Sequence, residues 1–383
     1  AIYAIRGRVL MGTSGVPGVL VNVTGDGVGS ATTNASGDYA VTGLTIGSFT
    51  ATPTAYGLVL SPVSRAVTIA GADATGQDFV ATRSGSGEEE VVVGLGNGGL
   101  GWLQGRGGAA SGYPIVKWFR VPWAPYYTAV GATHPALGDL DGDGLDEVVV
   151  GLGPYPAAGG WVAVFDDGLT GHRFLRWYRL PYAAYNAANV ETWPACGNFD
   201  ADPRSEIALG LGTNPSNGGW TLLVDDLSTG LRTIQWARAG QLDYLRANGA
   251  TYPAAGDVDG DGRDELVVGF GAGGRGLVSV LSAADGFRVQ RFARVPWDAY
   301  DSQVGATRPA CGNLDADARD EIAVGLQGAA SAGQWGVLDD QSTSFSWLLW
   351  RQVPWSAYNA AVGTTRPAIA DLDGDGRDEV AIG

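Results

Sequence analysis

The chain has 383 residues, 61 of them glycine, and its 40 acidic and 24 basic residues give a formal net charge of −16. So much glycine disfavours long helices and favours short strands joined by tight turns. The acidic balance argues against a nucleic-acid partner, because phosphate backbones attract clustered Lys and Arg. No apolar run approaches the roughly 20 residues that span a bilayer. We therefore expect neither nucleic-acid binding nor membrane insertion.

Residues 1–82 differ from the rest of the chain, since they contain none of its 13 Trp residues. They hold short runs of alternating apolar residues, such as AIRGRVL, GVLVNVTG and QDFVAT. Turn-forming residues separate these runs, which is typical of a small β-sandwich. The stretch that follows, RSGSGE at 83–88, is rich in Gly and Ser and predicts a short linker.

A repeated unit fills residues 89–383. A Glu followed by an apolar, Gly-containing strand recurs every 56–59 residues, and three further short strands keep the same phase. Four short strands in each repeat are typical of the blades of a β-propeller. We therefore predict an all-β protein, with an N-terminal β-sandwich followed by β-propeller blades of about 58 residues, five to six in number, the terminal blades being incomplete. The repeated acids are Glu90, Glu147, Glu206, Glu265, Glu321 and Glu379.

Acidic loops before these strands carry the main chemical signal. Three loops place carboxylates at positions 1, 3, 5 and 9 and a Gly at position 6. Alternate residues of a tight loop converge on one point, and Ca²⁺ prefers six to eight oxygen ligands, with a main-chain carbonyl from position 7. Without a cation the carboxylates would repel one another, so a solvated turn is the weaker interpretation. The predicted ligands are Asp139, Asp141, Asp143, Leu145 and Glu147; Asp257, Asp259, Asp261, Arg263 and Glu265; and Asp371, Asp373, Asp375, Arg377 and Glu379.

These loops are not EF-hands. An EF-hand needs its bidentate Glu at position 12, and that position holds Val150, Val268 and Ile382 here. The predicted metal site therefore lies between two strands and staples a blade.

Two further loops depart from the pattern, because Asn replaces the first carboxylate and position 6 holds Pro203 or Ala318. A position that needs positive φ disfavours Ala and excludes Pro. Three outcomes stay open for these loops: weak binding, binding with altered geometry, or no binding. The full and the atypical loops alternate along the chain, so the effective repeat is a candidate pair of blades. The corresponding ligands are Asn198, Asp200, Asp202, Arg204 and Glu206, and Asn313, Asp315, Asp317, Arg319 and Glu321.

The acidic loops with their Val-rich strands resemble FG-GAP/VCBS repeats, the blades of integrin-α-like calcium-binding β-propellers, over residues 89–383. The Phe-Gly pair of that family is not literal here. The resemblance implies calcium ligands at loop positions 1, 3, 5, 7 and 9. Residues 5–82, with IRGRVL and TTNASGDYAVTGL, resemble carboxypeptidase-regulatory-like (transthyretin-like) sandwich modules, which implies a spacer or stalk.

We expect a non-catalytic protein, secreted or on the cell surface, that binds Ca²⁺ and acts in adhesion or structural assembly. Its expected partners are other proteins or copies of itself, joined through open strand edges, with glycans as a further class. One alternative is a lectin that uses a repeated Trp/Tyr/Arg surface. A second is a polysaccharide-acting enzyme on a propeller scaffold, although no cleft of acid, base or Arg residues is visible outside the calcium loops.

Histidines and aromatic residues add weaker signals. His134 occupies a position that varies between repeats, so we expect it to be exposed and not catalytic. The periodic Trp177, Trp236 and Trp350 are expected to wedge the blades together. Aromatic residues outside the strands are the candidate ligand surface for the lectin alternative: Trp123, Trp297, Trp355, Tyr126, Tyr185, Tyr300 and Tyr358.

Overall fold

A computed structural model describes residues 1–11, 14–34, 36–55, 58–83, 91–108, 112–155, 159–168, 170–188, 191–200, 202–214, 218–240, 242–315 and 317–383. Contacts divide the chain into two compact units, Ala1–Gly87 with Asp167–Arg173, and Glu88–Asp166 with Phe174–Gly383. Each unit is described by itself. The predicted linker at 83–88, apart from Arg83, and the first repeated acid, Glu90, lie outside the described residues.

Two β-sheets form the N-terminal unit around one core. Apolar side chains alternate along the strands as the sequence predicts, and Ile5, Val21, Val41 and Phe49 are buried together between the sheets. The first sheet joins β1 (Tyr3–Met11), β2 (Ser14–Gly15), β5 (Asp38–Leu44), β7 (Leu58–Ser61) and β9 (Phe79–Arg83); the second joins β3 (Leu20–Gly25), β4 (Gly29–Thr32), β6 (Gly47–Thr54) and β8 (Arg65–Ile69).

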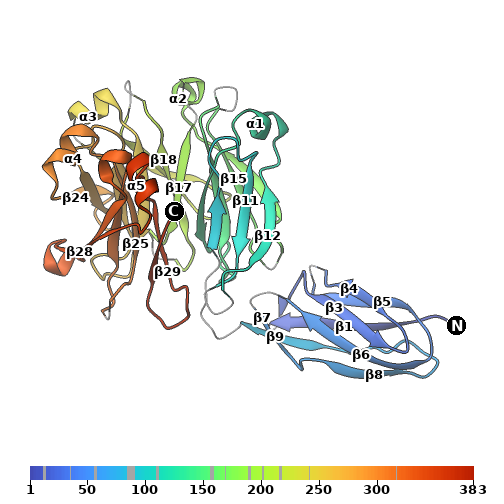
Figure 1. Ribbon diagram of the computed structural model, residues 1–383. Coiled ribbons are helices and arrows are strands. Elements are labelled where there is room, and N and C mark those ends of the chain that lie inside the picture. The colour runs from blue at the N-terminus through green and yellow to red at the C-terminus, as the bar shows by residue number, and fades with distance from the viewer. Residues whose placement is uncertain are drawn as a thin grey trace. The chain divides into compact units, whose positions relative to one another are not determined.

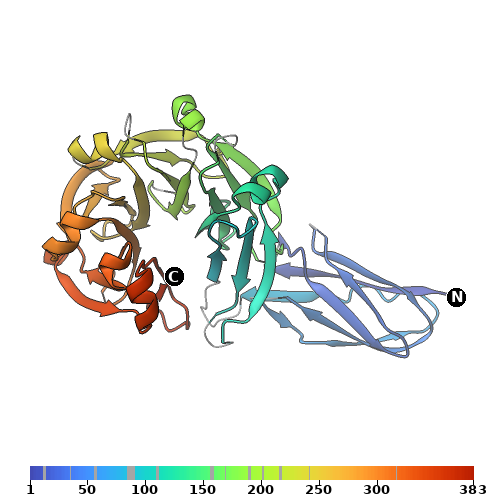
Figure 2. The same cartoon turned by 45° about the horizontal axis from the view of Figure 1, so that its top comes forward.

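Repeated antiparallel sheets form the second unit, as the sequence predicts, and Figures 1 and 2 show them following one another around an axis. Four sheets have four strands, the first has three and the last has two. In chain order the sheets are β10 (Val91–Gly94), β11 (Trp102–Arg106), β12 (Ile115–Arg120); β13 (Thr133–Gly138), β14 (Glu147–Leu152), β15 (Trp161–Phe165), β16 (Phe174–Arg179); β17 (Thr192–Gly197), β18 (Glu206–Leu211), β19 (Trp220–Val224), β20 (Thr233–Arg238); β21 (Thr251–Gly256), β22 (Glu265–Phe270), β23 (Leu277–Ser282), β24 (Arg288–Arg294); β25 (Thr307–Gly312), β26 (Glu321–Leu326), β27 (Gln334–Leu338), β28 (Trp347–Gln352); and β29 (Pro367–Ala370), β30 (Glu379–Ile382).

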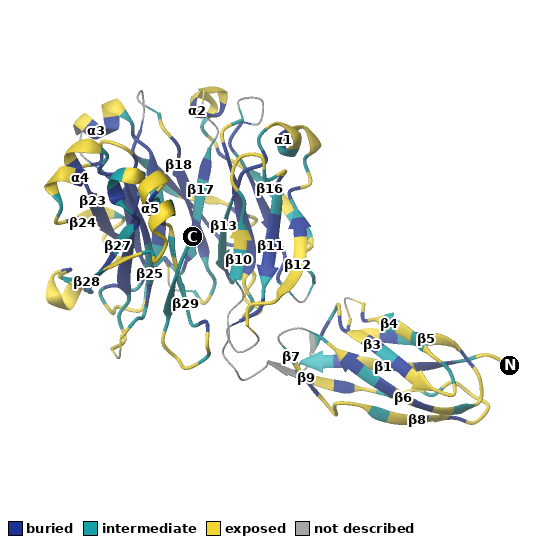
Figure 3. Ribbon diagram, viewed as in Figure 1, coloured by how far each residue is buried: buried dark blue, intermediate teal, exposed yellow. Residues whose placement is uncertain are grey.

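The second strand of each four-stranded sheet is wholly buried, which Figure 3 shows as dark blue. Neighbouring blades cover both of its faces, so its residues are apolar throughout rather than alternating. Gly151 on β14 marks the closest approach, because a Cβ there would lie 2.2 Å from the carbonyl oxygen of Thr192 on the next blade. The Gly in the repeated strand therefore serves the packing of blade on blade.

Each of the first five blades is followed by a six-residue helix that the sequence analysis did not anticipate. One and a half helical turns are too short to give a recognisable hydrophobic period. The helices are α1 (Ala124–Ala129), α2 (Ala183–Ala188), α3 (Leu242–Ala247), α4 (Asp298–Gln303) and α5 (Ser356–Ala361), with two 3₁₀ turns at η3 (Ala329–Ser331) and η4 (Gln341–Thr343). None of the helices in the described residues is long and apolar enough to cross a membrane.

Helix tyrosines are structural, which corrects their assignment to a ligand surface. Tyr126, Tyr185 and Tyr300 are at most 1% exposed. The hydroxyl of Tyr126 donates to the carbonyl oxygen of Ala132 and accepts the N–H of Gly153, at 2.7 Å, in the next hairpin. Tyr185 and Tyr300 make the equivalent bonds. These residues therefore pin each helix to the following blade.

The periodic tryptophans wedge the blades, as predicted. Trp177 on β16 lies 5.7 Å, between ring centroids, from Trp123 ahead of α1, and Trp236 on β20 lies 5.8 Å from Tyr182 ahead of α2. Each pair joins the outer strand of one blade to the segment that follows the preceding blade. Of the remaining candidates, Trp355 is 64% exposed.

Candidate metal centres

The first strands of the blades all run in the same direction, so equivalent loops of the second unit lie at the same end of the blades. Each acidic loop follows a first strand, such as β13, and the short helix precedes it, so Figure 1 shows all five helices at one end of the blades. The acidic loops consequently share the opposite end.

The loop between β13 and β14 is held by its own first carboxylate. The two oxygens of Asp139 accept the N–H groups of Gly142 and Gly144, each at 2.8 Å. Both glycines have positive φ, +84° and +83°, a conformation that suits Gly alone without strain. Position 6 of the predicted motif therefore needs Gly for the reason the sequence suggested.

Glu147, at the end of the loop, binds main-chain N–H groups at its start. It is 0% exposed, and its Oε2 accepts the N–H groups of Leu140 and Asp141 at 2.8 and 3.1 Å. Its Oε1 is buried and has no hydrogen-bond partner among the described residues. Burial, and then the carboxylates of Asp141 and Asp143, raise the pKa of Glu147 to about 9. A cation beside this oxygen would remove the cost of the buried charge.

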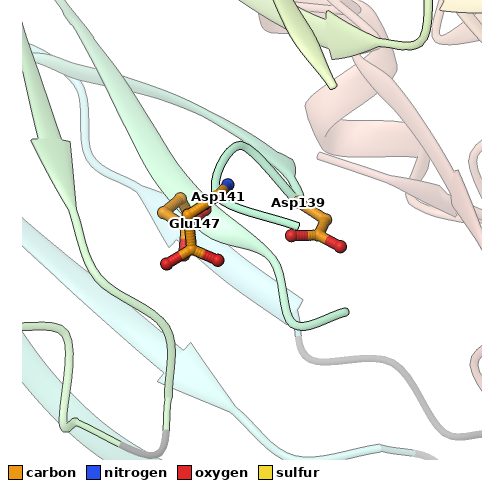
Figure 4. Close-up of side chains that lie close together, drawn as sticks. All are labelled: Asp139, Asp141 and Glu147. Atoms are coloured by element: carbon orange, nitrogen blue, oxygen red, sulfur yellow. The ribbon is translucent and has the colours of Figure 1, made fainter. Parts of the chain in front are cut away.

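Three of the predicted ligands converge in this loop. Carboxylate oxygens of Asp139, Asp141 and Glu147 lie within 4.8 Å of one another, and Figure 4 shows Asp141 beside Glu147, with Asp139 to one side of them. Asp143 instead accepts the N–H of Leu145 at 2.8 Å. This oxygen-rich, partly buried group suits a hard cation such as Ca²⁺.

The other two full loops repeat this geometry. Asp257 accepts the N–H groups of Gly260 and Gly262 at 2.7 and 2.9 Å, and it groups with Asp259 and Glu265. Both carboxylate oxygens of Glu265 are buried without a partner in the part of the chain that is described. In the last loop Asp371 accepts the N–H groups at positions 4 and 6, at 2.8 and 3.0 Å.

The atypical loops fold by a different bond. Asn198 donates its side-chain N–H to the carbonyl oxygen of Asp202 at 2.7 Å, and Asn313 donates to Asp317 at 2.6 Å. The side-chain amide at position 1 of the atypical loops donates a hydrogen bond to the main chain. In the full loop, by contrast, the carboxylate of Asp139 accepts hydrogen bonds from the main chain. The replacement of Asp by Asn thus changes the internal geometry of the loop as well as its charge.

Aspartates that the sequence analysis missed lie beside the loop at 198–206. Asp225 and Asp226 follow β19, and they form groups with Asp200, Asp202 and Glu206 whose oxygens lie within 4.8 Å. Asp226 is 1% exposed. A repeated Asp-Asp pair after the third strand, at 166–167, 225–226 and 339–340, is the signal that would have found them.

Arginines at position 7 of the atypical loops point back to the preceding loop. Arg204 donates from Nε to the carbonyl oxygen of Asp141 at 3.1 Å, and its Nη1 lies 3.4 Å from Asp202 and 3.8 Å from Asp226. Arg319 bonds Asp259 in the same way and lies 3.7 Å from Asp340. Each atypical loop therefore has a positively charged arginine side chain close to its aspartates.

A second missed feature links the blades. Asp264, at position 8 of its loop, accepts the N–H of Asn198 in the preceding blade at 2.8 Å. Asp320 accepts from Asp257 at 2.9 Å, and Asp378 accepts from Asn313 at 2.8 Å. The acid at position 8 thus ties the first residue of one loop to the next loop.

His134 is not exposed, which corrects the expectation from sequence. Its ring stacks on Trp193 with centroids 3.5 Å apart, and Nδ1 lies 2.9 Å from the carbonyl oxygen of Thr192. A carbonyl only accepts, so Nδ1 carries the proton. Burial lowers the pKa of His134 to about 3. Variation at this position reflects different partners inside the ring of strands rather than exposure.

Comparison with known families identifies one of the repeats. Residues 253–281, which span the second full loop, at 257–265, and β22, match the FG-GAP repeat. The other two full loops, at 139–147 and 371–379, carry the same spacing of acids. No curated protein matches the chain.

Two solved structures are similar to the chain at low identity. One is the rhamnogalacturonan lyase YesW, with 15% identity and a TM-score of 0.35 over all of this chain and 72% of that chain. The other is the V. cholerae biofilm matrix protein Bap1, with 16% identity and a TM-score of 0.35 over 71% of this chain. The similar region makes up 37% of the Bap1 chain.

Proposed function

We propose that the chain is an extracellular calcium-binding β-propeller protein that acts without catalysis in adhesion or structural assembly. The observation that carries the proposal is the buried, unpartnered carboxylate oxygen of Glu147, at the centre of a group that Asp139 and Asp141 complete. A buried carboxylate without a partner is costly. Ca²⁺ supplies the missing positive charge and accepts the oxygen ligands that the loop provides.

Calcium would act by stapling the blades. The loop joins the first two strands of a blade, and the position-8 acids Asp264, Asp320 and Asp378 each tie their loop to the one before it. Extracellular calcium modules bind with dissociation constants of roughly 0.1–1 mM. At ~2 mM calcium and a constant of ~0.1 mM, one site stabilises the folded state by about 1.8 kcal/mol and three sites by about 5 kcal/mol. Only calcium-rich surroundings provide this stabilisation, which supports a secreted or cell-surface location, as does the FG-GAP match.

Thermal unfolding with and without a chelator tests the proposal. We expect removal of calcium to lower the melting temperature by roughly 10–20 °C, given about 5 kcal/mol spread over three sites. A double variant, Asp139→Asn with Asp141→Asn, should lose one bound calcium by titration calorimetry. Asp298→Asn is the matched control, because Asp298 is a highly exposed carboxylate outside the loops. A melting temperature indifferent to chelator, with no calcium heat, would overturn the proposal.

Glycan binding is the second candidate, and Trp355, which is 64% exposed, favours it. An exposed aromatic face stacks readily on a sugar ring. A glycan array comparing the unaltered chain with Trp355→Ala tests this function, and the absence of any signal on the array would remove it. Activity against polysaccharides that survives loss of the calcium loops would instead support an enzyme.

Self-assembly through strand edges stays a prediction of the sequence. An unpaired edge presents main-chain N–H and carbonyl groups that pair readily with another chain. Electron microscopy with and without chelator would distinguish single molecules from rings or filaments. Single molecules under both conditions would contradict assembly while leaving the calcium proposal intact.

A further inference from the structure

A channel runs between the first strands of the blades. It has a volume of about 640 Å³, and the first strands β13, β17, β21, β25 and β29 line it, together with residues of β10 and β30. This volume falls within the range of about 300–1,000 Å³ that is typical of small-molecule sites. The acidic loops follow the first strands at one end of the channel. The residues near the beginning of these strands lie toward the other end, away from the loops.

The residue directly before the Pro of each first strand lines this channel, and together these residues form what we call the channel cluster: His134, Trp193, Tyr252, Arg308 and Arg366. Their rings pack on one another. His134 stacks flat on Trp193, and Trp193 meets Tyr252 edge-on with centroids 5.1 Å apart. Five equivalent positions of the repeats therefore make one aromatic and cationic surface.

Arg308 is the unusual member of the channel cluster. It is 8% exposed, and its guanidinium carbon lies 3.8 Å from the ring centroid of Tyr252 and 4.4 Å from that of Trp193. Its Nε is buried and has no hydrogen-bond acceptor among the residues that the structure describes. A buried charged donor without an acceptor is costly, so this group is set up to receive one.

A second guanidinium lies beside the first. The guanidinium carbon of Arg366 is 5.4 Å from the Trp193 centroid, and the side chain is exposed. Glu191 interacts electrostatically with both arginines. At this end of the channel the two guanidinium groups outnumber the carboxylate of Glu191, and Asp146, beside the acidic loop, is the acid among the other lining residues. The local field therefore attracts a monoanion.

We propose that the channel cluster binds an organic carboxylate, with its anionic group on Arg308 and Arg366 and its body against Trp193 and Tyr252. A guanidinium offers paired N–H donors that match the two oxygens of a carboxylate. The aromatic faces favour a flat or ring-shaped body. Acidic sugars and the carboxyl terminus of a peptide both present this chemistry.

The carboxylate site is separate from the calcium loops. Asp139 lies five steps along the extended strand from His134, which corresponds to about 17 Å. A bound acid is therefore not a ligand of the proposed calcium, and the two sites are testable independently.

Titration calorimetry of the full chain in saturating calcium tests the proposal with four acids: D-glucuronate, benzoate, acetate and N-acetyl-alanine. D-glucose is the uncharged counterpart of the first. We expect 1:1 binding of at least one acid and none of glucose. Tighter binding of glucuronate would identify a sugar acid as the source, and tighter binding of N-acetyl-alanine a peptide terminus. No saturable binding of any acid would overturn the proposal.

Variants then assign the binding to the two arginines. Arg366→Gln alters an exposed residue and should fold normally, yet it should weaken carboxylate binding at least tenfold. Arg308→Lys keeps the charge but loses the paired donors, so it should also weaken binding. Arg351→Gln, on β28 and outside the channel lining, is the matched control and should bind like the unaltered chain. Equal affinity in all three variants would contradict the assignment, whatever the outcome of the chelator experiment.

Discussion

Arg204 donates from its Nε to the main-chain carbonyl oxygen of Asp141, 3.1 Å away in the preceding blade. Arg319 makes the same bond to Asp259. Both arginines lie in atypical loops and both acceptors lie in full loops, so the loops are coupled in pairs. The alternation seen in the sequence therefore has a structural basis, in which the guanidinium of one loop steadies the backbone of its neighbour.

The first prediction concerns the number of calcium ions. The guanidinium of Arg204 lies near Asp202 and Asp226, where it offsets part of the negative charge that would attract a metal. We expect the three full loops to bind calcium more tightly than the two atypical loops. Arg204→Gln should add calcium binding at the loop 198–206, and calorimetry should detect it as a higher stoichiometry or affinity.

The same variant should also lose about 1 kcal/mol of stability in chelator, because its bond to Asp141 is gone. Arg263→Gln is the matched control, since Arg263 holds position 7 of a full loop and should leave the calcium stoichiometry as it is. An unchanged calcium isotherm for Arg204→Gln would contradict the idea of a built-in cation.

The second prediction tests how closely the blades approach. A Cβ at Gly151 would lie 2.2 Å from the carbonyl oxygen of Thr192, which belongs to the next blade. Gly151→Ala must push the two blades apart, and we expect a loss of roughly 2–4 kcal/mol in urea unfolding. Gly96→Ala provides the control, because a Cβ there meets nothing within 4 Å. Similar stability of the two variants would mean that the blades are loosely packed.

The third prediction addresses the link between loops. The carboxylate of Asp264 accepts the main-chain N–H of Asn198 at 2.8 Å. Asp264→Ala leaves that partly buried donor unpaired and should cost about 1–3 kcal/mol. Chemical denaturation measures this loss, and Asp285→Ala, at an exposed aspartate in a turn, should change stability by no more than about 0.5 kcal/mol. Equal effects of the two substitutions would remove the proposed link.

Repetition made the strands and the full loops predictable. Glu147 and its counterparts recur in a fixed phase, so the sequence gives both the limits of the blades and the acids at the ends of the first strands. Gly144 could be assigned to position 6 because only positive φ explains a Gly there, and its φ is +83°. Such local features depend on the residues of a single loop.

Contacts between blades were not predictable in the same way. Asp226 reaches Glu206 from a different strand, and Arg204 reaches Asp141 from a different blade. Tyr126 looked like a surface residue because its short helix has no hydrophobic period, yet it is 0% exposed. His134 looked exposed because its position varies. Equivalent residues of different repeats contact one another at the channel. The sequence of a single repeat does not reveal such contacts.

The fourth prediction is a pH dependence of stability that belongs to His134. Its pKa in the folded chain is about 3, because burial disfavours the charged ring and Arg366 and Arg308 add repulsion. In the unfolded chain the pKa is about 6.5. Between pH 6.5 and pH 3 the imidazole is protonated in the unfolded state but neutral in the folded state. The contribution of His134 to the free energy of unfolding is therefore fully present above pH 6.5 and decreases as the pH falls toward 3.

His134→Tyr removes this dependence while keeping a ring, since Tyr252 occupies the equivalent position on β21. The difference in unfolding free energy between the unaltered chain and the variant should shift by about 1–2 kcal/mol between pH 7.5 and pH 5, in favour of the variant. The acidic loops titrate in both proteins and cancel in the comparison. Urea titrations at the two pH values measure the shift, and a constant difference would show that His134 protonates freely in the folded chain.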